Sequence, residues 1–182
     1  MSNEVIAAIH DRRSIRSYTT DAVSDEQLKI LEQAAVDSPS ANNRQPYKFV
    51  FVRNKALLDD FRADFREGYY AVNPAAKEKE PDYDVTRGAT CVCFIFADNA
   101  NRWAPVDSGI AVENLALAAH AIGLGSVILG MPLALFESEI GAKWNEKLGC
   151  PENMSFCVAI GIGVPAGTKP AHQNREGLIA EI

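Results

Sequence analysis

The sequence predicts a single domain of the α/β or α+β class, in which helices alternate with four or five strands. A length of 182 residues suits one domain. The composition, 47% hydrophobic and 23% charged, is that of a globular chain with a buried core. Short runs of β-branched and aromatic residues alternate with helical patterns, with no internal repeat or linker. We therefore treat residues 1–182 as one domain.

Helix-start signals locate the helices of the first half. Ser24-Asp-Glu-Gln27 is a capping box, and its helix is expected to end near Asp37, before Pro39. Asn54 can cap the next helix. Residues 67–88 contain two prolines and many charges, which predicts an irregular loop or lid.

The remaining elements follow from hydrophobic periodicity. Strands are expected over 47–52, 90–97, 126–129 and 155–161, and helices over 3–11, 105–122 and about 135–148. The helix over 105–122 is apolar on nearly every face, and such a helix is buried on all sides. Either its own chain wraps it or a second subunit covers one face. We favour the second subunit, which predicts a dimer.

The charge balance excludes some partners. With 24 acidic and 18 basic residues the net charge is −6, and no basic arm is present, which argues against nucleic acid. The segment from Leu115 to Phe136 carries no charge and has the length of a membrane span. Three glycines and a proline interrupt it, so it fits a helix end, a turn and a buried strand better.

Cysteine usage indicates a reducing compartment. The four cysteines show neither zinc-ligand spacing nor a secreted disulfide framework, and the N-terminus has no signal segment. We expect a cytoplasmic protein. The cysteines are Cys91, Cys93, Cys150 and Cys157.

A basic cluster near the N-terminus is the first candidate site. Arginine is a planar, permanently charged donor that matches phosphate geometry. In an extended segment, Arg12, Ser14 and Arg16 would lie on one side and Arg13 on the other. The first three could converge on one anion, although in isolation a solvated basic turn is the favoured interpretation of the cluster. The glycine motifs fit neither a dinucleotide fingerprint nor a P-loop, so any phosphate must be bound by arginines.

Four segments in the right order make the whole chain resemble the flavin-dependent nitroreductase family. They are residues 12–16 (RRSIR), residues 38–47 (SPSANNRQPY), the stretch from Asp107 to Ser126, and residues 161–165 (GIGVP) with Arg175. The resemblance implies an α+β fold: a three-layer α/β/α sandwich with a mixed sheet of four to five strands and a long central helix at a dimer interface. It also implies FMN as cofactor.

The resemblance further implies which residues bind FMN. Arg12 and Arg16 would hold the phosphate and the flavin pyrimidine edge, with Arg13 and Ser14 in the same pocket. A polar loop would reach the flavin of the other subunit through Pro39, Ser40, Asn43 and Gln45.

Three other segments would complete the site. Asn73 would contact the flavin ring, the main chain of Ile128, Leu129 and Gly130 would border its N5 edge, and Arg175 would close on the phosphate. The family often has a lysine two residues before that arginine. This chain has Gln173 there, with His172 beside it.

The implied function is hydride transfer from NAD(P)H through flavin N5 to a nitroaromatic, a quinone or a similar small oxidant, by a ping-pong mechanism in a homodimer. No side chain is expected to act as nucleophile and no metal is expected. His10, His120 and His172 are interpreted as structural or surface residues. The alternatives are a flavin reductase or dehalogenase-like enzyme of the same fold, and an FMN-binding module without turnover.

Overall fold

The computed structural model describes residues 3–171 and 173–182. Its centre is a four-stranded sheet with the strand order β1-β2-β4-β3, and every pair of neighbours is antiparallel. The strands are β1 (Tyr47–Val52), β2 (Cys91–Asp98), β3 (Gly125–Leu129) and β4 (Met154–Gly163).

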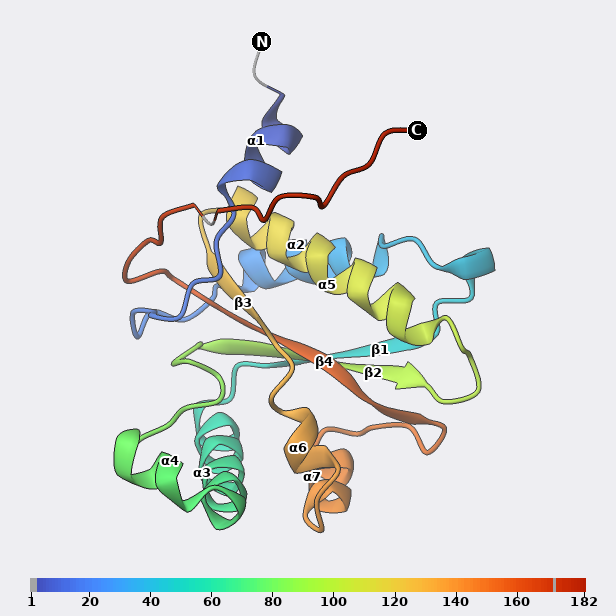
Figure 1. Cartoon of the computed structure of the whole chain (residues 1–182). Helices are drawn as coiled ribbons and strands as arrows, with labels where there is room; N and C mark the ends of the chain where they lie inside the picture. The colour runs from blue at the N-terminus through green and yellow to red at the C-terminus, as the bar shows by residue number, and fades with distance from the viewer. Residues whose placement is uncertain (1–2, 172) are drawn as a thin grey trace.

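Helices cover both faces of this sheet (Figure 1). One layer contains α2 (Asp25–Val36) and α5 (Ala104–Ala121), and the opposite layer contains α3 (Lys55–Val72), α6 (Leu133–Phe136) and α7 (Gly141–Lys147). Two short helices, α1 (Glu4–Asp11) and α4 (Pro74–Lys79), and one 3-10 turn (Ala41–Asn43) complete the chain. The predicted α/β/α sandwich of the α+β class is thereby confirmed.

The central strand β2 shows why both faces need a helical layer. Successive side chains of a strand point to opposite faces. Cys91, Cys93 and Ile95 pack toward α2 and α5, while Val92 and Phe94 pack toward α3, α6 and α7. All five are buried, so β2 contributes to two hydrophobic cores. Cys91 and Cys93 are therefore core residues.

Local signals set the helix ends as predicted. The Ser24 hydroxyl accepts a hydrogen bond from the Gln27 N–H, and the Gln27 side chain accepts one from the Ser24 N–H. Asn54 caps α3 by accepting from the Leu57 N–H at 3.0 Å.

The prediction of an irregular loop over residues 67–88 is wrong for its first half. Helix α3 continues to Val72 because Phe65 and Tyr69 stack on Tyr83, and α4 then begins at Pro74. Proline favours the first turn of a helix, where no N–H is required.

The single helix predicted over 135–148 is also wrong, because it is divided into α6 and α7. A Cβ atom at Gly141 would lie 2.1 Å from the Phe136 carbonyl oxygen. The chain therefore turns too tightly between these helices for any residue other than glycine.

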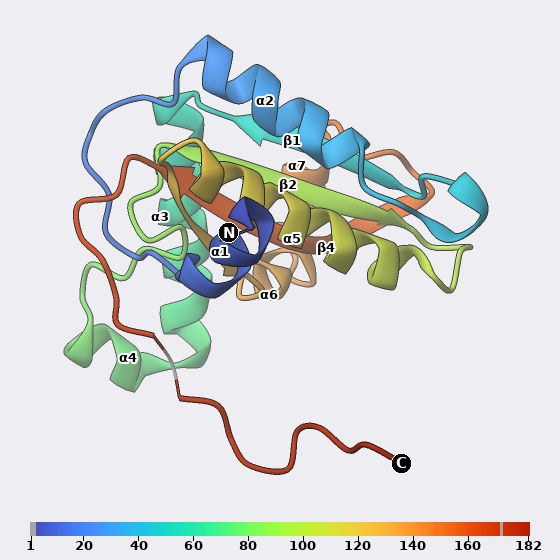
Figure 2. The ribbon, with the colours of Figure 1, turned by 90° about the horizontal axis from the view of Figure 1, so that it is seen from above.

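The sheet is not mixed, in contrast to the prediction. All its strand pairs are antiparallel, and the parallel pairing found among the described residues is an isolated bridge between Ser14 and Ser126, outside the sheet strands. No helix in the part of the chain that the structure describes is both long and apolar enough to cross a membrane. The tail that follows β4 leaves the sheet at Pro165 and extends away from it (Figure 2).

Candidate functional site

The basic N-terminal segment is held against the edge strand β3. The Ile15 N–H donates to the Ser126 carbonyl at 2.8 Å, and the Ile15 side chain is buried. A Cβ at Gly125 would lie 3.0 Å from the Ile15 side chain, so glycine permits this close approach. The Tyr18 hydroxyl donates to the Ile15 and Gly161 carbonyls at 2.8 and 3.2 Å. Burial raises the pKa of Tyr18, which keeps the phenol protonated as a donor.

This segment lines a cationic hollow of about 270 Å³, which we call the arginine cavity. Arg12, Arg13, Ser14 and Arg16 all contribute to it. The expectation that Arg13 points away from the other three is therefore wrong, because an isolated bridge at Ser14 does not impose regular strand alternation over the whole segment. The tail residues Lys169 and Pro170 close the hollow.

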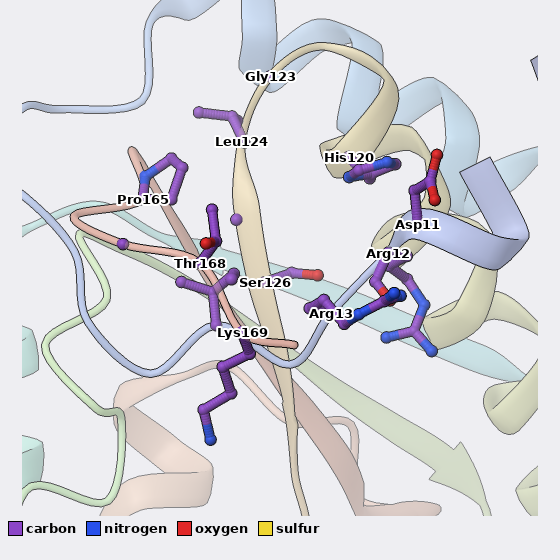
Figure 3. Close-up of a pocket in the computed structure, with 13 residues that line it drawn as sticks. Asp11, Arg12, Arg13, His120, Gly123, Leu124, Ser126, Pro165, Thr168 and Lys169 are labelled. Carbon is purple, nitrogen blue, oxygen red and sulfur yellow. The ribbon is translucent and has the colours of Figure 1, made fainter. Parts of the chain in front are cut away.

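A second hollow of about 310 Å³ adjoins the arginine cavity (Figure 3). Arg12, Arg13 and Lys169 line both. His120, at the end of α5, is also on its wall, together with the Gly123–Ser126 segment that leads into β3. Five nitrogen-bearing side chains thus line the two adjoining hollows beside β3, together with the carboxylate of Asp11; they are Arg12, Arg13, Arg16, His120 and Lys169.

The charges in this region are only partly compensated. Arg12 Nε donates to Glu113 Oε1 at 3.1 Å. Arg13 bonds through one nitrogen to main-chain carbonyls, while its buried Nε atom has no hydrogen-bond partner within the described residues. No carboxylate forms an ion pair with Arg13, Arg16 or Lys169 in that part of the chain. A buried donor without a partner is rare in folded proteins. The arginine cavity is therefore suited to an anionic ligand that accepts several hydrogen bonds.

The polar loop predicted to reach a partner's flavin has a defined shape. The Asp107 carboxylate, buried in α5, accepts from the Ala41 N–H at 3.2 and 3.3 Å, and Ser40 Oγ accepts from the Gln45 N–H at 2.9 Å. Asn43 and Gln45 adopt positive φ angles of 52° and 47°. Such left-handed conformations in residues other than glycine are uncommon and cluster at functional sites.

Within one chain this loop does not meet the arginine cavity. The 3-10 turn of the loop and the segment after α1 lie at opposite ends of the molecule in two perpendicular views (Figures 1 and 2). Pro39, Asn43 and Gln45 are exposed, and Ser40 is half-buried. A site that uses both segments must therefore be assembled from two chains.

The other residues predicted to bind FMN differ in exposure, and none of them lines the arginine cavity. At the end of β3, Ile128 and Gly130 are exposed whereas Leu129 is buried, and no strand of the described chain pairs along the outer edge there. Asn73 joins α3 to α4 and bonds Tyr69, away from the arginine cavity. Arg175 and Gln173 are exposed in the tail and do not line that cavity either. His172 lies outside the described residues.

Sequence reasoning missed two residues of this region. Lys169 lies in a tail without periodicity, so no pattern indicated where its side chain would reach. His120 had been interpreted as structural or surface. His120 lies one helical turn after the buried Ala116 and three residues before Gly123. This spacing was the available sequence indication that His120 lies near the cavity.

The chain thus forms a three-layer sandwich with a cationic hollow beside its edge strand β3. The model of the family described as the nitroreductase family matches residues 9–163. A provisionally named NADH dehydrogenase/NAD(P)H nitroreductase from Archaeoglobus fulgidus is 32% identical over 176 residues, which cover 93% of this chain and 90% of the relative.

Two further comparisons also point to the nitroreductase family. The NADPH-flavin oxidoreductase of Vibrio harveyi is 32% identical over 165 residues, covering 90% of this chain and 66% of the relative. The crystal structure of a nitroreductase with bound FMN from Desulfitobacterium hafniense is 27% identical, with a TM-score of 0.89 and complete coverage of both chains. The chain belongs to the nitroreductase family. The predicted family and the predicted class of enzyme, a nitroreductase-type oxidoreductase, are thereby confirmed.

Proposed function

We propose that this protein is an FMN-dependent oxidoreductase that uses NAD(P)H, with the FMN phosphate in the arginine cavity. One observation carries this proposal: three guanidinium groups and Lys169 surround a hollow beside β3 in a chain of the nitroreductase family. The unpartnered Nε of Arg13 fits a phosphate, which offers several acceptor oxygens. The FMN-bound relative from Desulfitobacterium hafniense supports the choice of cofactor.

The residues of this chain would place the flavin as follows. Arg12, Arg13 and Ser14 bind the phosphate, and Arg16 lies toward the pyrimidine edge of the ring. The main chain of Ile128–Gly130, at the end of β3, would offer an N–H to the flavin ring near N5. A guanidinium near the pyrimidine carbonyl would stabilise negative charge on the reduced ring, because opposite charges attract.

When bound, FMN would supply the redox chemistry: it would take up hydride from NAD(P)H and return two electrons, with protons from solvent, to a small oxidant such as a nitroaromatic or a quinone. No side chain of this protein acts as a nucleophile. The two buried thiols of β2 are unsuited to act as nucleophiles, because burial raises the pKa of Cys91 to about 12 and that of Cys93 well above its usual value. Both therefore stay protonated and unreactive at neutral pH. Because donor and oxidant occupy the same face of the ring in turn, we expect ping-pong kinetics.

The protein acts as a homodimer with FMN at the interface. The separation of the two flavin-binding segments within one chain supports this. So does α5, which exposes 53% of Val106 and 39% of Ile110. Interfaces of obligate dimers bury roughly 2,000 Å² or more and resemble a core cut in half. The four cysteines are free thiols, which agrees with a cytoplasmic location.

Steady-state kinetics with the purified protein test this function. We expect a flavin absorption band, oxidation of NADH or NADPH that depends on an added nitroaromatic or quinone, and parallel lines in double-reciprocal plots. A protein that carries FMN but oxidises neither nucleotide would instead be a binding module. The Vibrio harveyi relative favours one further candidate, reduction of free flavin, which would appear as a preference for added FMN over nitroaromatics as oxidant.

A further inference from the structure

A third hollow, of about 400 Å³, opens between the N-terminal segment and the turn that follows α4. We call it the Arg87 pocket. Arg16 lies on its wall as well as on the wall of the arginine cavity. If Arg16 lies toward the pyrimidine edge of FMN, the Arg87 pocket borders the flavin at that edge. Its use in the reaction therefore rests on the function proposed above.

The turn that carries Arg87 is fixed by a dense polar network. Asp84 Oδ1 accepts from the N–H and the hydroxyl of Thr86 at 2.7 and 2.8 Å, and Asp84 Oδ2 accepts from the Gly88 N–H at 2.7 Å. Arg62 donates to Thr86 Oγ1 at 2.7 Å and forms an ion pair with Asp84 at 3.3 Å. Thr86 is fully buried. Such a network holds the position of the residue inside the turn, which is Arg87.

Arg87 is held in an unusual backbone conformation and stacked in place. Its φ angle is +58°, a left-handed value that is uncommon for residues other than glycine. Its guanidinium lies 4.7 Å from the centre of the Tyr83 ring and donates to the Tyr83 hydroxyl at 3.3 Å. Tyr83 is buried and stacks in turn on Phe65 and Tyr69. The guanidinium is thus pre-positioned, and little entropy is lost when it binds a ligand.

The pocket is lined by two arginines, Arg16 and Arg87, and by the carboxylates of Glu80, Asp82 and Asp84. Within the described residues, Arg16 and Arg87 form no ion pair with a carboxylate. The Asp84 carboxylate is already paired with Arg62 and the turn. Glu80 and Asp82 also line the pocket, but both residues are exposed, so their charges are largely screened by water.

We propose that Arg87 binds a carboxylate group on an aromatic oxidant and so determines which substrates this enzyme prefers. A planar guanidinium matches a carboxylate with two parallel hydrogen bonds, and its free face can stack on an aromatic ring. The pocket therefore takes a singly charged aromatic acid, with the reducible group directed toward the flavin.

Paired substrates test this specificity. The rate constant kcat/KM is measured for 4-nitrobenzoate and for the neutral analogue 4-nitrobenzamide, with the wild-type protein, Arg87→Gln and Arg87→Lys. Because a hydrogen bond to a charged group is lost, Arg87→Gln should lower kcat/KM for the carboxylate about tenfold or more and leave that for the amide unchanged. Arg87→Lys, which keeps the charge, should recover part of the loss. FMN content should not change, and Lys29→Gln on the exposed surface of α2 is the matched charge control.

A binding measurement keeps the test independent of turnover. Calorimetry with benzoate and benzamide should give weaker binding of benzoate alone in Arg87→Gln. An equal loss for acid and amide, no loss for either, or a loss confined to NADPH relative to NADH would overturn the proposal. If the wild-type protein binds benzoate through Arg87 but oxidises no NAD(P)H, the proposed function fails whereas the carboxylate site stands.

Discussion

Arg12 contacts the Glu113 carboxylate and, in the proposed site, the FMN phosphate. The contribution of each contact can be measured separately, as apoprotein stability and as FMN affinity. Arg12→Ala removes a charge-assisted phosphate contact, which costs about 1.5–3 kcal/mol of FMN binding free energy. The ion pair with Glu113 is half-exposed and contributes little to folding. We therefore expect a strongly raised FMN dissociation constant with a nearly unchanged melting temperature of the apoprotein. Full FMN occupancy after dialysis of the variant would contradict the assigned site.

Either Lys169 or Arg175 is the cation of the C-terminal tail that binds the FMN phosphate. The resemblance to the family indicated Arg175, whereas the structure places Lys169 on the arginine cavity and leaves Arg175 exposed. We expect Lys169→Ala to weaken FMN binding more than Arg175→Ala, as measured by fluorescence titration of the apoprotein. The opposite order would mean that the tail takes another course when FMN is bound.

At the residue scale, the sequence pointed only to chemistry that is local in the chain. The cluster Arg12–Arg16 was recognisable because its arginines are neighbours and because their spacing suits phosphate. Lys169 and Arg87 lie in segments without hydrophobic periodicity. Their positions depend on contacts with distant parts of the chain, Arg87 through Tyr83 and the Arg62–Asp84 pair, which no local pattern encodes.

At the scale of elements, Asp64 links α3 to α7 through hydrogen bonds. Its carboxylate accepts from Lys143 Nζ at 2.6 Å and from Trp144 Nε1 at 2.9 Å. Burial acts to raise the pKa of Asp64, but the hydrogen bonds from Lys143 and Trp144 outweigh it and hold the pKa below its usual value of 3.8. A lowered folded-state pKa stabilises the protein above the unfolded pKa, and this contribution is lost as the pH falls through the folded pKa.

Asp64→Asn should therefore lower the free energy of unfolding by about 1 kcal/mol at pH 7. The difference from wild type should shrink as the pH falls below about 4, where the wild-type carboxylate takes up a proton. Urea unfolding at several pH values measures this. Asp60→Asn, on the same helix and paired more loosely with Lys147 at 3.5 Å, should show a smaller effect. A difference that stays constant down to pH 2 would rule out the ionic role of Asp64.

Element prediction depended on how local the signal was. The starts of α2 and α3 followed from N-terminal caps, which act within four residues. The break between α6 and α7 did not, because it depends on the space between Gly141 and Phe136 rather than on helix propensity. The extension of α3 past Glu67 was missed because the charged residues there suggested a loop. Contacts of Phe65 and Tyr69 with the distant Tyr83 stabilise the helix instead.

For the whole molecule, the face of α5 that carries Val106 and Ile110 should be the contact between subunits. Ile110→Lys places a charge where one chain leaves the side chain 39% exposed. A folded monomer tolerates this change, but a buried dimer interface does not, because an unpaired charge is costly to desolvate. We expect the dimer and FMN to be lost together, as measured by size-exclusion chromatography with flavin absorbance. Val72→Lys, on the opposite helical layer and 84% exposed, should alter neither.

The measurement that tests the account most directly is sedimentation of the purified protein, followed in the flavin absorption band. The account predicts one boundary with twice the 19.8 kDa chain mass and one FMN per chain, since each site needs segments from two chains. A colourless dimer would contradict the assigned cofactor, and a stable monomer saturated with FMN would contradict the two-chain site.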